Sequence, residues 1–155
     1  MNQPIAVPTR PTIFTFQNIP YLWGSKNPAQ GLDCFGLLNY VLYTYTGKII
    51  PDMDWIYQTY PHESDAPTNI AEIETKRLLG EKADGRGMAL ELVLLGWTRE
   101  QFGLGCIIFD RGKKYVVHAN TPQSRITEYS RISPIVRGVW DVLHSGIMVE
   151  VDKFC

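Results

Sequence analysis

The sequence has no long hydrophobic run, no surplus of charge and no leader-like start, and each absence excludes a class of protein. No stretch of about 18 apolar residues occurs, so no membrane-spanning helix is expected. The 15 basic and 16 acidic residues leave a net charge of -1, which argues against a partner made of nucleic acid or anionic membrane. The first residues lack a basic segment followed by an apolar core, so a signal peptide is not expected.

Cysteine is also scarce. The three cysteines, Cys34, Cys106 and Cys155, are too widely spaced for a disulfide framework or a CxxC zinc site, and free thiols in a reducing compartment are expected. A metal site made from Cys34, Cys106 and His118 would need these distant residues to converge without any short ligand spacing. We therefore expect no metal and no other cofactor.

What is present is an ordinary globular composition. The chain has 155 residues, of which 45% are hydrophobic and 20% charged, enough for one domain with a core of its own. Residues 1–20 contain four prolines and little periodicity, which indicates an extended arm that docks on a partner or on the domain's own sheet. We expect residues 21–155 to form a single domain.

Helical periodicity is concentrated in the first half of the chain. Residues 34–46 repeat apolar side chains at helical spacing, with Asp33 placed to cap the start and Gly47 to end the helix. A second helix is expected over 69–79, where Asn69 and Glu72 have capping-box spacing. The intervening residues 48–67 have the prolines of a loop.

The second half is typical of β-strands. Short runs rich in β-formers occupy residues 89–95, 105–109, 115–119, 125–129, 135–142 and 147–151, with a hairpin turn at 110–113. Helices come first and strands later, so we predict an α+β domain with a mostly antiparallel sheet.

Cys34 is the candidate nucleophile, because it stands in the first turn of the predicted main helix. The positive end of a helix dipole favours a thiolate there, and the thiolate is the attacking form of cysteine. The carboxylate of Asp33 opposes this effect by raising the thiol pKa, so Asp33 is expected to serve mainly as the helix cap. A cysteine hydrolase also requires a base, which the rest of the chain must supply.

Several motifs appear in a fixed order along residues 20–142. They are Tyr21-x-Trp-Gly, Asp33-Cys34-x-Gly-Leu-Leu, Gly47-Lys-Ile-Ile-Pro51, Glu91-Leu-Val-Leu-Leu95, Lys114-Tyr-Val-Val-His-Ala119, Arg125-Ile-Thr-Glu128 and Val136-Arg-Gly-Val-Trp140. In this order they resemble the NlpC-type cell-wall cysteine peptidases, and most closely the versions encoded with phage tail-tip genes.

The resemblance implies a papain-like α+β fold, in which the cysteine helix packs on an antiparallel sheet. It also implies hydrolysis of peptide bonds in peptidoglycan stems. By motif match Cys34 takes the nucleophile position, and His118 takes the third position, which orients the base. Tyr21 takes a position that lines the substrate site, beside which Asp33 is also expected.

The chain departs from the family at the base itself. The family's histidine precedes the third member by about twelve residues, where this chain has Leu104, or Cys106 if the turn has no insertion. Neither side chain accepts a proton as an imidazole does. His118 is therefore either paired directly with Cys34 or a polar residue whose hydrogen bonds are satisfied, beside the former active-site cleft. The remaining histidines, His62 and His144, stand at unmatched positions.

Two functions are compatible with these residues. One is a phage tail-tip or tail-assembly protein that keeps the peptidase fold with impaired catalysis, acts as a structural adaptor and binds other tail-tip or hub proteins. The other is an active endopeptidase that cuts stem peptides during genome delivery, with Cys34 as nucleophile and an unmatched base. The resemblance places either protein in the virion tail, or in the host cytoplasm during assembly. The dense aromatic residues around the main helix are either core or a partner surface.

Overall fold

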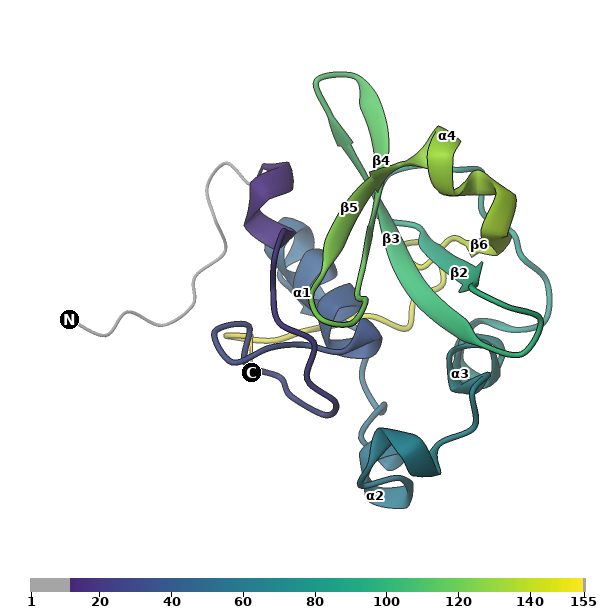
Figure 1. The fold of residues 1–155 in the computed structure, drawn as a ribbon. Helices are drawn as coiled ribbons and strands as arrows, with labels where there is room; N and C mark the ends of the chain where they lie inside the picture. Colours follow the sequence, from purple (N-terminus) through teal and green to yellow (C-terminus); the bar gives the residue numbers. More distant parts are fainter. Residues whose placement is uncertain (1–11, 155) are drawn as a thin grey trace.

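The structure, a computed structural model, describes residues 12–154 and has the α+β architecture predicted from the sequence (Figure 1). Helices pack on a five-stranded antiparallel sheet. The helices are α1 (Cys34–Thr46), α2 (Trp55–Thr59), α3 (Ile70–Leu79) and α4 (Tyr129–Ile132), with 3-10 turns η1 (Ile13–Phe16), η2 (Glu63–Asp65) and η3 (Ser133–Ile135). The strands are β1 (Lys48–Ile49), β2 (Leu92–Gly96), β3 (Phe102–Asp110), β4 (Lys113–His118), β5 (Arg125–Glu128), β6 (Val136–Trp140) and β7 (Val149–Glu150).

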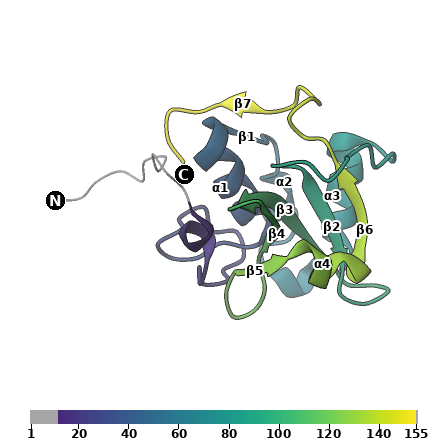
Figure 2. The same ribbon diagram turned by 90° about the horizontal axis from the view of Figure 1, so that it is seen from above.

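The main sheet has the order β5-β4-β3-β2-β6, and every neighbouring pair is antiparallel. Helices α1 and α3 pack on one face of this sheet, and α4 lies against the other (Figures 1 and 2). Strands β1 and β7 form a separate two-stranded ribbon beside α1 (Figure 2). Within the described residues no helix is long and apolar enough to cross a membrane.

Helix α1 has the bounds that the sequence predicts, because both ends carry their own signals. Asp33 caps the start, and its Oδ1 accepts a hydrogen bond of 2.9 Å from the amide of Gly36. Gly47 ends the helix in the left-handed conformation with φ 73°, which glycine adopts without strain. The helix buries most of its surface against β3, β4 and the ribbon.

Alternation along β3 decides which side chains can reach α1. Leu104, Cys106 and Ile108 belong to the core between the sheet and α1. Ile107 instead packs with Val93, Leu95, Val116 and Ile132 in a smaller core on the opposite face. Because successive strand residues point to opposite faces, Gly103 and Gly105 share the side of Ile107.

Residues 48–67 differ from the sequence-based expectation, whereas residues 12–20 follow one of the two alternatives expected for the arm. Residues 48–67 are not simply a loop, because β1, α2 and η2 lie within them. Residues 12–20 lie on the domain itself: Phe16 is fully buried, and the amide of Ile19 donates to Ser124 Oγ at 2.8 Å. This part of the expected arm docks beside the start of β5. Residues 1–11 lie outside the described part of the chain.

Candidate functional site

The side chain of Cys34 lines a cavity of about 410 Å³ at the start of α1. The cavity lies between the 63–70 segment and the ends of the central strands. Its lining residues are Tyr21, Trp23, Cys34, Glu63, Ala66, Pro67, Thr68, Ile70, Trp97, Gln101, Phe102, Gly103, Ala119, Asn120 and Thr121. Its volume lies within the range of small-molecule sites. Tyr21 and Cys34, both predicted as site residues, are thus brought together.

The surroundings of Cys34 favour the neutral thiol. Its pKa is raised well above the ordinary value, first by burial and then by the carboxylates of Asp33 and Glu63. The backbone amides of Leu104 and Phe35 act in the opposite direction but do not compensate. Desolvation of the thiol therefore outweighs the effect that was expected from the helix dipole at this site.

Asp33 is fully buried and has a structural position. Its Oδ2 accepts hydrogen bonds from the amide of Gly24 at 2.9 Å and the hydroxyl of Tyr57 at 2.7 Å, while Oδ1 caps α1. Burial nevertheless raises the pKa of Asp33, and the three donors partly offset this. Asp33 does not line the cavity, so the structure supports its predicted role as a cap and does not bring it to the expected substrate site.

Of the two positions expected for the missing base, Leu104 is the one whose backbone interacts with the thiol of Cys34. Its side chain is buried on the α1 face of β3. Cys106 lies two residues further along the same face, is fully buried and has a raised thiol pKa because of that burial. Neither residue supplies a group that takes a proton from Cys34 near neutral pH.

His118 lies on the other face of the sheet. It pairs with Gly105 in the β3–β4 register, and side chains of paired residues project to the same side. Its ring lies 5.4 Å from the ring of Trp97, and its Nε2 is 2.9 Å from Thr127 Oγ1. Burial, assisted by Arg125, lowers the pKa of His118 to about 4. The structure thus brings His118 to Thr127 and not to Cys34.

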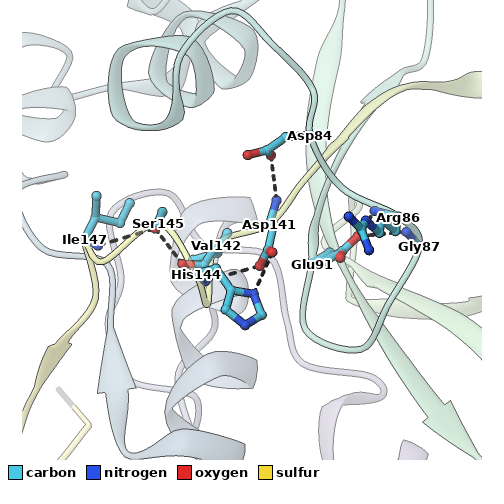
Figure 3. Close-up of polar contacts among 9 residues, drawn as sticks. All are labelled: Asp84, Arg86, Gly87, Glu91, Asp141, Val142, His144, Ser145 and Ile147. Carbon is cyan, nitrogen blue, oxygen red and sulfur yellow. Dashed lines mark hydrogen bonds and ion pairs between the residues drawn. The ribbon is translucent and has the colours of Figure 1, made fainter.

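The other two histidines are exposed and do not line the cavity. His62 precedes the 3-10 turn η2. His144 follows β6, and its Nδ1 lies 2.6 Å from Asp141 Oδ2 (Figure 3). Asp141 is in turn fixed by a bond from its amide to Asp84 Oδ1 at 3.0 Å. The ring of His144 is exposed at the surface.

Glu63, Trp97 and Asn120 are among the cavity residues that the sequence did not indicate. Glu63 accepts a hydrogen bond from the hydroxyl of Tyr21. Burial is the main cause that raises the pKa of Tyr21, and the hydrogen bond to Glu63 and the charge of Glu63 act in the same direction, so the phenol keeps its proton and donates. No local pattern signals these residues, since the Tyr21–Glu63 contact spans 42 positions of the chain.

A second cavity of about 410 Å³ lies beyond the Asp33–Tyr57 contact, next to the β1–β7 ribbon. Its floor includes Phe35, Ile50 and Phe154, and Lys26 and Asp54 form an ion pair at its rim. It holds no cysteine or histidine. Across residues 12–154 no three histidine, cysteine or acidic side chains are arranged to hold a metal ion.

No family model matches the chain, and a search of curated proteins found no significant match.

Proposed function

We propose that this chain is a phage tail-tip or tail-assembly protein with a papain-like fold of the NlpC cell-wall peptidase type, and that its catalysis is impaired. The order of motifs along residues 20–142 supports the family. The α+β architecture, with a cysteine at the start of a helix packed on an antiparallel sheet, is compatible with it.

One observation carries the proposed loss of catalysis. Within residues 12–154 no histidine lines the Cys34 cavity, and the backbone of Leu104, one of the two positions expected for the base, interacts with the thiol. General base assistance contributes roughly 10²- to 10⁴-fold in rate. The raised pKa of Cys34 removes the remaining advantage of cysteine, which is the small thiolate fraction of an ordinary thiol at neutral pH. Efficient turnover is therefore not expected.

A structural role fits the exposed apolar side chains at the edge of the domain. Phe14 in η1 is 72% exposed, and Phe109 near the end of β3 is 47% exposed. Large aromatic side chains are enriched at protein interfaces, so these two are suitable contacts for another tail protein. The partner would be a neighbouring tail-tip or hub subunit.

The alternative is an active endopeptidase that cleaves peptidoglycan stem peptides. The open cavity beside Cys34 favours this endopeptidase, because a site that had lost its substrate would no longer be required to remain open. Release of stem-peptide fragments from purified peptidoglycan separates the two, with Cys34→Ala as the comparison. The impaired-enzyme proposal predicts equal, background release from both proteins. Release by the wild type alone would instead establish the hydrolase.

A further inference from the structure

Strand β5 forms one edge of the main sheet (Figures 1 and 2). Its only strand partner within the described residues is β4, so one side of its backbone faces no other strand. Residues 125–127 make no backbone hydrogen bond outside the β4 pairing in the part of the chain that the structure describes. The free N–H and C=O groups of an edge strand are a template on which a further strand can pair.

A cavity of about 530 Å³ lies along this edge. It is lined by all four residues of β5, by Tyr115 of β4 and by Arg131 of α4. It shares no lining residue with the Cys34 cavity. What this cavity binds is therefore a separate question from the proposed function, and its answer does not depend on that function.

The charge of this cavity is positive. Arg125 and Arg131 are both exposed, and neither forms an ion pair with another residue of the range 12–154. The acidic side chain of the cavity, Glu128, is already paired, because its Oε1 lies 3.7 Å from Lys113 Nζ. Two arginines are thus left for an external carboxylate, which the planar guanidinium group can bind through two parallel hydrogen bonds.

The lining side chains are separated by the two faces of the sheet. Arg125 and Thr127 project to the face against which α4, the helix of Arg131, lies. Ile126 and Tyr115 instead pack with the core on the α1 side. Because side chains of paired residues project to the same side, a strand added to β5 would keep this alternation. Its residues would meet arginines on one face and apolar side chains on the other.

We propose that the β5 edge is a docking site for an extended acidic segment of a partner protein, which adds to the sheet as a further strand. Carboxylates at alternate positions of that segment bind Arg125 and Arg131, and the residues between them lie over Ile126 and Tyr115. Main-chain hydrogen bonds supply affinity in this mode of recognition, and the alternate side chains supply selectivity. The arginines also disfavour pairing with a basic strand.

The test measures binding of two matched peptides to the full chain by calorimetry. One is acetyl-Thr-Glu-Val-Glu-Val-Glu-Thr-amide, and the other has glutamine in place of each glutamate. We expect the acidic peptide to bind about tenfold more tightly, since each of two exposed ion pairs contributes up to about fivefold. This preference should weaken as salt increases.

Hydrogen exchange tests whether the peptide adds as a strand. In the complex with the acidic peptide, the amides of residues 125–127 that face away from β4 should exchange more slowly, because they would donate to the added strand. A peptide held by charge alone would leave these amides unprotected.

The double variant Arg125→Gln and Arg131→Gln is diagnostic, because it removes both charges and retains the edge strand. It should abolish the preference for the acidic peptide. The double variant Arg99→Gln and Arg137→Gln is the matched control. It removes the same total charge from exposed positions between β2 and β3 and on β6, the opposite edge strand, and should leave the preference unchanged. Circular dichroism checks that both proteins are folded.

Equal binding of the two peptides would overturn the proposal, as would a preference that survives the loss of Arg125 and Arg131. Binding of the acidic peptide without slower exchange at residues 125–127 would also overturn it, since the peptide would then not be an added strand. The same conclusion follows if neither peptide binds at about 1 mM, the weak end of measurable affinity.

Discussion

Replacing Leu104 with histidine should restore part of the missing chemistry. Leu104 lies on the α1 face of β3 and its backbone interacts with the Cys34 thiol, so an imidazole at this position would be beside the nucleophile. A positioned base contributes roughly 10²- to 10⁴-fold in rate. We therefore expect Leu104→His to alkylate at Cys34 at least about tenfold faster than the wild type at pH 7.5, and to release stem peptides above background.

The variant has a predictable cost. Leu104 is 3% exposed, and exchanging this apolar side chain for a buried imidazole should destabilise the fold by about 2–4 kcal/mol. A typical domain is stable by about 5–15 kcal/mol, so the variant should remain folded. Urea unfolding measures the cost directly.

The assay follows iodoacetamide labelling at Cys34 by mass spectrometry, which separates it from the other thiols. Cys106→His is the matched control, because it places an imidazole two residues further along the same face. The double variant with Leu104→His and Cys34→Ala measures any release of stem peptides that does not depend on the Cys34 thiol. A folded Leu104→His protein whose Cys34 reacts no faster than the wild type would refute the placement of the base position.

Further predictions concern the groups around the site. Asp33→Asn leaves the half-buried amide of Gly24 without its acceptor and should lower the free energy of unfolding by about 1–3 kcal/mol. Tyr57→Phe should lower it by about 1 kcal/mol, as measured by urea titration. An Asp33→Asn protein as stable as the wild type would contradict this hydrogen-bond network. His118 has a folded pKa of about 4, below the ordinary 6.5, so the unfolded state takes up its proton first as the pH falls. Stability should thus decrease by about 3 kcal/mol between pH 6.5 and 4, and His118→Gln should reduce that decrease; an unchanged pH profile would show that His118 is not buried as described. In the wild type, Cys34 should react with iodoacetamide more slowly than a cysteine in a short peptide at pH 8, since its pKa is raised; a faster reaction would indicate a stabilised thiolate.

The helix at Cys34 illustrates what local sequence predicts well. Asp33 and Gly47 are cap and stop signals that act within a few residues, so both ends of α1 could be predicted without knowledge of the rest of the fold. The α+β class follows similarly from periodicity. By contrast, α2 lies in a segment with prolines at either side, where the loop signals are stronger than the short helical one.

The position of His118 shows what local sequence does not predict. Its motif places it at the end of a strand, as observed, but the face it occupies depends on the strand register. A shift of one residue moves every side chain to the opposite face, and no feature of the β4 segment alone specifies that shift. Glu63 was missed for a related reason, because a long-range contact with Tyr21 brings it to the cavity.

The most direct test of the central claim is the release of stem-peptide fragments from purified peptidoglycan by the wild-type chain and by Cys34→Ala, with both proteins shown to be folded. We expect the same background release from both, because no histidine lines the cavity beside the thiol within the described residues. Release by the wild type that disappears in Cys34→Ala would contradict it and identify a working hydrolase.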